Sequence, residues 1–237
     1  MTKVEQHIIK FAKAYSLFSL ADLYNSSKEI SRQYMQWSLV RLVSKGTVVR
    51  VKRGLYKLSE KPRFSYSVKE VTKQLYSFLK DSFRYAPFCV YDGDILAPLQ
   101  HHLSYNCLTY IETDRFVVDA VFRALQENGH KVFNKPDKDE FYKYVDISAP
   151  AIIVKPMVSD SPLMTIEGVP GPTLEKLLVD IRRDKDFDYL SGEESVRMFE
   201  NAFNMFSINI TKLLRYAGRR GARTEFENEI KELNYDK

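Results

Sequence analysis

The feature that most constrains the fold of this chain is the stop signal Lys45-Gly46, where a helical pattern ends and a β-hairpin pattern begins. Apolar residues recur at helical spacing from Met35 to Val43 and form one face. Ser31 is placed to cap the start of this helix. A cationic last turn followed by glycine is a common helix end. The pattern therefore predicts a helix between Ser31 and Lys45.

Two short β-like segments follow this helix. Residues 47–51 and 55–58 are rich in Val, Leu and Tyr, and Lys52-Arg53-Gly54 joins them. Gly54 can take the positive φ that a tight turn requires. Together the two segments predict a β-hairpin with a basic tip.

Two further helices are expected before the hairpin. Apolar residues at helical spacing predict one over residues 3–15. Ser19 followed three residues later by Asp22 resembles a capping box and predicts the start of the other. Three short helices and a basic hairpin are typical of a winged helix-turn-helix, in which the third helix enters the DNA major groove.

Charge is distributed unevenly along the chain. Residues 1–60 hold 11 Lys/Arg against 4 Asp/Glu, whereas residues 61–208 hold 18 against 22 and residues 209–237 hold 7 against 5. A compact basic domain on a mildly acidic body favours a nucleic-acid reader. The alternatives are a basic face that only aids solubility and a winged helix that binds protein.

The expected DNA-contacting residues lie on the third helix and the hairpin. Arg and Gln side chains that point away from the core can read guanine and adenine edges, and hairpin cations can contact phosphates or the minor groove. These candidate residues are Arg32, Gln33, Gln36, Arg50, Lys52 and Arg53. Trp37 is expected to be half-buried against the hairpin or the second helix. Arg41 and Lys45 are expected to be solvated or to face the helix C-terminus.

Two segments resemble a known family. The segment "LVSKGTVVRVKRGLYKL", with Arg53-Gly54-Leu55-Tyr56 in the hairpin, is similar to the N-terminal domain of AbiEi antitoxins. Residues 171–180 resemble an acidic-leading segment at the start of a C-terminal-domain helix in AbiEi-like chains. The resemblance covers residues 1–60 closely and 85–220 loosely. It implies an autorepressor that binds its own promoter and counteracts a nucleotidyltransferase-like toxin of a type IV (abortive-infection) toxin–antitoxin system.

The rest of the chain is expected to form a second domain. A polar stretch with Pro62 predicts a linker over residues 59–66, so the domains are 1–60 and 67–237. The expected strands are 88–91, 107–111, 131–133, 151–154 and 163–166. The expected helices are 115–128, 174–183, 193–205, 208–217 and 224–233. The overall fold class is α+β: a winged helix-turn-helix, then a larger α+β domain with a C-terminal helical section.

No residue set in the second domain meets the spacing required for catalysis, a metal or a cofactor. Asp92-Gly93-Asp94 lacks the upstream Gly-Ser element of a nucleotidyltransferase, and a turn explains it. Asp184, Asp186 and Asp188 alternate like a calcium loop, but Tyr189 and Ser195 occupy positions that need Gly and Glu. We therefore expect an acidic loop and no enzyme. A DNA-targeted nuclease or nucleotidyltransferase remains the alternative.

A basic run lies near the C-terminus. Between residues 209 and 223 there are five cations and no acid. They are Lys212, Arg215, Arg219, Arg220 and Arg223. One interpretation is structural, with dipole capping and pairing to Asp180 or Asp184. The other is a second surface that contacts the DNA backbone or a toxin.

Apolar runs are short and cysteines are few. The longest apolar runs, such as residues 149–154, are much shorter than the roughly 20 residues that span a bilayer. Cys89 and Cys107 cannot make a disulfide framework and are expected to be core thiols. We expect a cytoplasmic protein with reduced thiols, with duplex DNA and a toxin as partners and no membrane.

Overall fold

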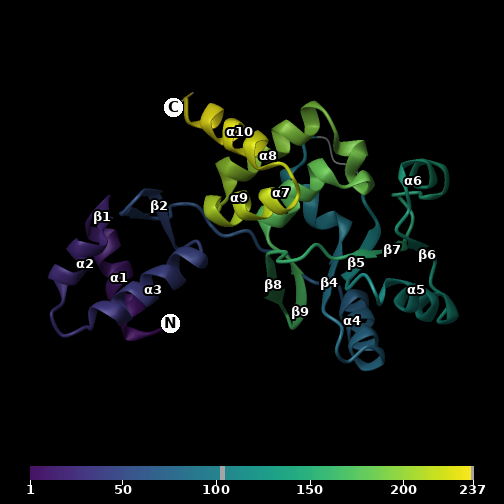
Figure 1. Ribbon diagram of the computed structural model, residues 1–237, viewed down its shortest axis with the longest axis horizontal. Coiled ribbons are helices and arrows are strands. Elements are labelled where there is room, and N and C mark those ends of the chain that lie inside the picture. Colours follow the sequence, from purple (N-terminus) through teal and green to yellow (C-terminus); the bar gives the residue numbers. More distant parts are fainter. Residues whose placement is uncertain (102–104, 236–237) are drawn as a thin grey trace. The chain divides into compact units, whose positions relative to one another are not determined.

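The computed structural model describes residues 1–101 and 105–235 and divides into two compact units (Figure 1). The first unit contains residues 1–64 and 203–209. The second contains residues 65–202 and 210–237. The helices and several sheets together are α+β.

The first unit combines short helices with a small sheet (Figure 1). Its elements are α1 (Lys3–Ala14), β1 (Phe18–Ser19), α2 (Leu20–Ser26), α3 (Arg32–Ser44), β2 (Val48–Lys52) and β3 (Leu55–Leu58). The strands pair antiparallel in the order β1-β3-β2. The helices enclose a core of buried apolar residues, which includes Ile8, Leu23, Met35, Leu39 and Leu42.

Local capping explains where these helices begin. The expected capping box of α2 is present, because the Ser19 hydroxyl accepts from the Asp22 amide and the Asp22 carboxylate accepts from the Ser19 amide. Ser31 accepts a hydrogen bond from the Tyr34 amide at the start of α3. Each side chain satisfies an amide that has no partner within its helix. The three predicted helices are therefore confirmed.

The predicted hairpin is also confirmed. Strands β2 and β3 pair from Val48↔Leu58 to Lys52↔Leu55, with an irregularity between Arg50 and Lys52. Gly54 has φ +79° in the turn, which a glycine adopts without steric cost.

The second unit is built on a four-stranded mixed sheet (Figure 1). Its strands are β4 (Phe88–Asp92), β5 (Leu108–Thr113), β6 (Val132–Asn134), β7 (Ala151–Pro156), β8 (Leu163–Ile166) and β9 (Val169–Pro172). The sheet order is β4-β5-β7-β6, with β4 antiparallel to β5 and both β5 and β6 parallel to β7. Strands β8 and β9 form a separate hairpin.

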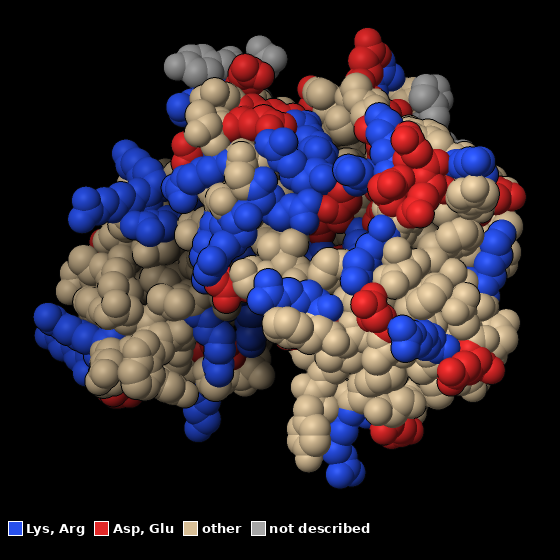
Figure 2. Space-filling model, turned by 45° about the vertical axis from the view of Figure 1, so that its right-hand side comes forward, with Lys and Arg blue, Asp and Glu red and all other residues tan. Residues whose placement is uncertain are grey.

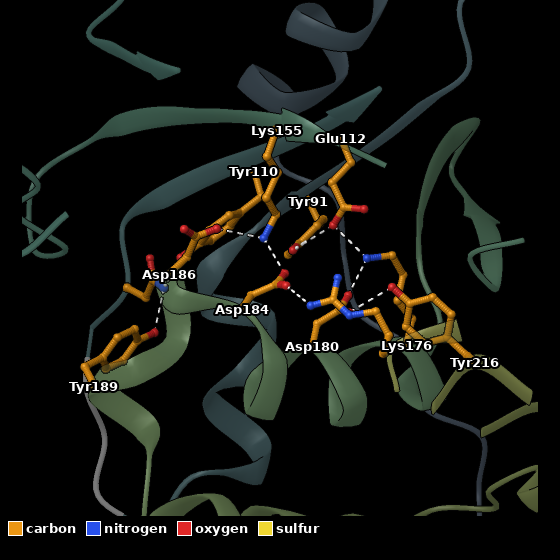
Figure 3. A network of polar contacts seen from close by, with 12 residues as sticks. Tyr91, Tyr110, Glu112, Lys155, Lys176, Asp180, Asp184, Asp186, Tyr189 and Tyr216 are labelled. Atoms are coloured by element: carbon orange, nitrogen blue, oxygen red, sulfur yellow. Dashed lines mark hydrogen bonds and ion pairs between the residues drawn. The ribbon is translucent and has the colours of Figure 1, made fainter. Parts of the chain in front are cut away.

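Helices cover both faces of this sheet. The helices of the unit are α4 (Glu70–Ser82), α5 (Val118–Glu127), α6 (Lys138–Tyr144), α7 (Leu174–Arg183), α8 (Glu193–Met205), α9 (Ile210–Arg219) and α10 (Arg223–Tyr235). The described residues also form the 3-10 helices η1 (Gly93–Leu99) and η2 (Lys185–Leu190). Leu75 and Leu79 of α4 join Val121 of α5 in an apolar core on one face. The opposite face of β5 and β7 is charged and lies against α7 (Figure 3).

Sequence patterns placed most of these elements but not all. Helix α7 has the bounds predicted for it. Helices α4 and α6 and strand β9 were not predicted. Residues 203–209, expected in the second domain, cluster with the first unit. There the Ser207 amide donates to the Pro62 carbonyl at 2.9 Å, and Phe206 packs edge-on against Phe64.

Among the described residues, none of the helices combines the length and the apolar character needed to cross a bilayer.

Candidate nucleic-acid interface and a buried charged cluster

The outward face of α3 carries the residues expected to read DNA. Arg32, Gln33 and Gln36 are all exposed, as their spacing against the buried Met35 predicts. The Arg32 guanidinium lies 5.4 Å from the centroid of the Tyr24 ring. This contact limits the orientations of the Arg32 side chain while leaving it accessible.

Trp37 was expected to be half-buried, and that prediction is wrong. Its exposed fraction is 63%, and Val40, one turn further on, is 61% exposed. Trp37 lies on the side of α3 opposite Leu39, and Val40 is exposed beside it, so neither packs into the core. The candidate interface therefore has an apolar strip beside its polar side chains.

Arg41 and Lys45 do not act as free surface cations. Arg41 Nε lies 2.8 Å and Lys45 Nζ 3.1 Å from Oε1 of Glu5. Glu5 is completely buried and also accepts from the Thr2 amide in the capping box of α1. This amide hydrogen bond, with Lys45 and Arg41, lowers the pKa of Glu5 to about 2. Both cations are about half exposed, as expected for solvated side chains, and in addition they fasten α3 to the start of α1.

The hairpin keeps its cations accessible. Arg50, Lys52 and Arg53 are exposed. In the part of the chain that the structure describes, no acidic side chain pairs with any of the three. The hairpin therefore offers positive charge to a partner without first breaking an ion pair.

The second unit contains a cluster of charges that the sequence did not reveal (Figure 3). Lys155 of β7 lies 2.7 Å from Asp184 and 2.8 Å from Asp186. It also lies 5.2 Å from the ring centroids of both Tyr110 and Phe187. A buried ammonium group is stable here because two carboxylates and two ring faces replace its water.

A second buried lysine continues the cluster on α7. Lys176 is 1% exposed and pairs with Glu112 of β5 at 2.7 Å and with Asp180 one turn further on. The Tyr216 hydroxyl donates to Asp180 at 2.8 Å. The cluster therefore joins the sheet, α7 and α9 (Figure 3).

Two carboxylates of the cluster have opposite pKa shifts. Burial raises the pKa of Asp180 to about 6, and Lys176 offsets this only in part. Burial acts the same way on Asp184, but Lys155 and Arg220 outweigh it and lower the pKa of Asp184 to about 2. Pairs of titratable groups with separated pKa values in a cleft often mark functional sites.

The expected acidic loop is therefore wrong for two of its three residues. Asp184 and Asp186 are directed at Lys155 and are largely buried, whereas Asp188 pairs with the exposed Lys138. The sequence did contain one signal for this cluster: a lysine within an otherwise apolar segment, which must be paired with acids if the segment is buried. Lys155 ends an apolar strand, and Lys176 lies within an apolar helix.

Most of the C-terminal basic run is paired with acids. Lys212 lies 4.0 Å from Glu175, Arg219 pairs with Asp160, Arg220 pairs with the buried Asp184, and Arg223 lies 2.8 Å from Glu227. Arg215 is exposed, and no acidic partner for it is found among the described residues. On the face in Figure 2, Lys and Arg side chains lie directly against Asp and Glu side chains over much of the upper surface.

The remaining candidate groups form no metal centre. Within residues 1–101 and 105–235, no three His, Cys, Asp or Glu side chains converge in a way that could hold a metal ion. Cys89 is buried, and burial raises its pKa well above the usual value. Cys107 is half-buried.

Fold and surface together define a chain with a small basic helical unit, which ends in a β-hairpin, and a larger α+β unit with a buried ionic cluster. The chain belongs to a family of unknown function, DUF6577, whose model matches residues 34–236. A second family model, described as transcriptional regulator, AbiEi antitoxin, matches residues 6–58. No curated protein matches the chain. The AbiEi-like resemblance of the first unit is thus confirmed, and it supports a regulator and antitoxin role.

Proposed function

We propose that the first unit is a winged helix-turn-helix that binds duplex DNA. The observation that carries this proposal is the exposed face of α3, with Arg32 and Gln36, beside a hairpin whose cations have no acidic partner in the described chain. Arg and Gln match the donor and acceptor patterns of guanine and adenine in the major groove. Hairpin cations supply phosphate contacts that set the position of the helix.

The biological role we propose is that of an antitoxin and autorepressor. The AbiEi match supports regulation of transcription together with toxin control. In this proposal the chain binds its own promoter in the cytoplasm, and the second unit counteracts a nucleotidyltransferase-like toxin. We assign no catalysis to the second unit, and metal-dependent turnover of nucleotides or DNA by the purified full chain would contradict that assignment.

A mobility-shift titration on the promoter DNA tests the first step. Binding of Lys and Arg to phosphates releases counterions, so log Kd should rise linearly with log salt concentration. We expect affinity to fall steeply between low and physiological salt. An affinity that does not change with salt would contradict the proposal.

Substitutions separate base reading from positioning. Gln36→Ala or Arg32→Ala should cost on the order of 1–3 kcal/mol on the promoter and relax specificity, because a bidentate base contact is lost. Lys52→Ala should instead weaken promoter and random DNA equally and reduce the salt slope by about 1. Lys13→Ala, on the exposed side of α1, is the matched control. It should change neither the affinity for promoter DNA nor the affinity for random DNA. If the α3 variants lose only non-specific binding, α3 is not the reading helix.

A further inference from the structure

A groove follows one edge of the sheet in the second unit. It consists of two adjacent hollows that share Pro156 and Val158 as lining residues. One hollow, of about 280 Å³, reaches the charged cluster. The other, of about 560 Å³, is lined by Pro87, Arg115, Phe116 and Met157 among others.

The groove lies where parallel strands end. Strands β5 and β7 run parallel and finish at Thr113 and Pro156, and the residues that follow them line the groove. Lys135, directly after β6, lines the charged hollow. In open sheets with parallel strands, ligands bind outside the carboxyl ends of the strands.

The charged hollow has more cations than acids. The cations are Lys135, Lys155, Lys176, Arg183, Lys185 and Arg220. The acids are Glu112, Asp180, Asp184 and Asp186. Arg183 and Lys135 pair with Glu225 and Asp119, which lie outside the lining. Among the described residues, Lys185 is the lining cation for which no acidic partner is found, and its free amine favours an anionic ligand.

The rim cations are free to turn toward such a ligand. Lys185 is exposed, and among the described residues it has no acidic partner. Lys135 pairs with Asp119, but both side chains are well exposed. Exposed ion pairs contribute little and exchange readily, so a phosphate group can compete for these amines.

The other hollow carries an aromatic platform. Phe116 is 80% exposed, and the Arg115 guanidinium lies 4.5 Å from its ring centroid. An exposed ring beside a guanidinium plane is the arrangement on which nucleobases stack. At 80% exposure the ring lies outside the core of the unit.

The backbone beside the groove is strained at two positions. Lys135 has φ +47° and Asp160 has φ +56°. Both follow strands of the sheet, and both residues line the groove. Side chains other than glycine rarely adopt this region, and such positions cluster at ligand sites.

We propose that this groove binds a nucleoside phosphate, with the base on Phe116 and the phosphates at the charged hollow near Lys185 and Lys135. The site is independent of DNA binding by the first unit. The same chemistry is offered by a free nucleotide and by the phosphorylated end of a single-stranded nucleic acid. The experiment therefore includes both sources.

Isothermal titration of the full chain at low salt tests the proposal. The probes are ATP, GTP, CTP, UTP, inorganic phosphate and a 5′-phosphorylated tetranucleotide. We expect at least one nucleotide or the tetranucleotide to bind more tightly than inorganic phosphate. Tighter binding by the tetranucleotide identifies a nucleic-acid end, whereas tighter binding by a nucleotide identifies a free nucleotide, and both results support the site.

Variants connect this binding to the groove. Phe116→Ala should weaken it about tenfold through lost stacking, whereas Phe116→Trp should retain it. Lys185→Glu should also weaken it about tenfold. Lys131→Glu, at the opposite end of β6, should leave it unchanged.

Any one of several results would overturn the proposal. They are binding by none of the probes, binding that neither Phe116→Ala nor Lys185→Glu changes, and inorganic phosphate that binds as tightly as every nucleotide. A loss of binding in Lys52→Ala alone would place the ligand on the first unit and would equally reject the groove.

Discussion

Glu5 illustrates how much a single buried carboxylate organises in the first unit. It caps α1 through the Thr2 amide and receives Arg41 and Lys45 from α3. The two helices are held by one group, because a buried carboxylate is stable only when its oxygens accept hydrogen bonds or face cations. Arg41 and Lys45 of α3 therefore have a structural role, whereas Arg32 at the start of α3 remains accessible for binding a partner.

Replacing this carboxylate should destabilise the first unit. Glu5→Gln leaves Arg41 and Lys45 without an acid, so we expect a lower Tm at pH 7. The pKa of Glu5 is lowered to about 2. Its stabilising contribution is therefore present above the unfolded pKa of about 4.5 and is lost as pH falls toward 2.

Thermal melts at several pH values check this expectation. The Tm difference between the variant and the wild type should shrink below pH 4. Glu29→Gln, at an exposed loop position, is the control and should melt like the wild type. Equal melting of Glu5→Gln and wild type at pH 7 would show that this carboxylate is dispensable.

Helix α9 and the residue after it divide the arginines of the basic run. Leu213, Tyr216 and Ala217 face the interior, whereas Arg215 and Arg219 face outward. Arg220 follows the helix and pairs with the largely buried Asp184. The basic run is thus divided between a surface and a structural contact.

Charge reversal should distinguish these two roles. The double change Arg215→Glu and Arg219→Glu should lower promoter affinity or toxin neutralisation without changing the melt. Arg220→Glu should instead destabilise the second unit by about 3 kcal/mol, because it leaves Asp184 facing a like charge. If the double variant keeps its melt, its DNA binding and its neutralising activity, this surface has no part in function.

At the scale of the whole molecule, the described residues include a buried charged cluster between the sheet and α7. Burying so many charges costs free energy unless every group is paired. Here each lysine has two carboxylates. The cluster residues also line the charged hollow of the groove, so the charges that cost free energy to bury lie next to a possible binding site.

Asp180 should make the stability of the second unit depend on pH. Its pKa is raised to about 6 in the folded chain, above the unfolded value of 3.8. A raised carboxyl pKa stabilises the fold below pH 3.8, and this contribution is lost as pH rises through 6. Between pH 4 and 7 the wild type should therefore lose on the order of 2–3 kcal/mol relative to Asp180→Asn.

Urea unfolding at pH 4, 5, 6 and 7 measures this difference. Only its trend with pH is diagnostic, since Asp180→Asn also removes a partner of Lys176 at every pH. Asp188→Asn is the control, because its carboxylate lies outside the buried cluster. The raised pKa of Asp180 would be contradicted if the difference in unfolding free energy stayed constant. It would also be contradicted if the wild type became more stable relative to Asp180→Asn as pH rises.

Local signals in the sequence determined the first unit. The caps at Ser19 and Ser31, the stop at Lys45-Gly46 and the turn at Gly54 act within a few residues. Their hydrogen bonds form between chain neighbours, so residue order alone predicts them. Helix α7 was predicted from the helical stretch that follows Pro172, and it has the predicted bounds.

Only the tertiary structure decided the pairings across the chain. Lys155 meets Asp184 and Asp186 about thirty residues later, and residues 203–209 join the first unit. The exposure of Trp37 was decided in the same way. These features depend on which surfaces lose water when distant segments pack, and desolvation is a property of the folded chain that no local pattern encodes.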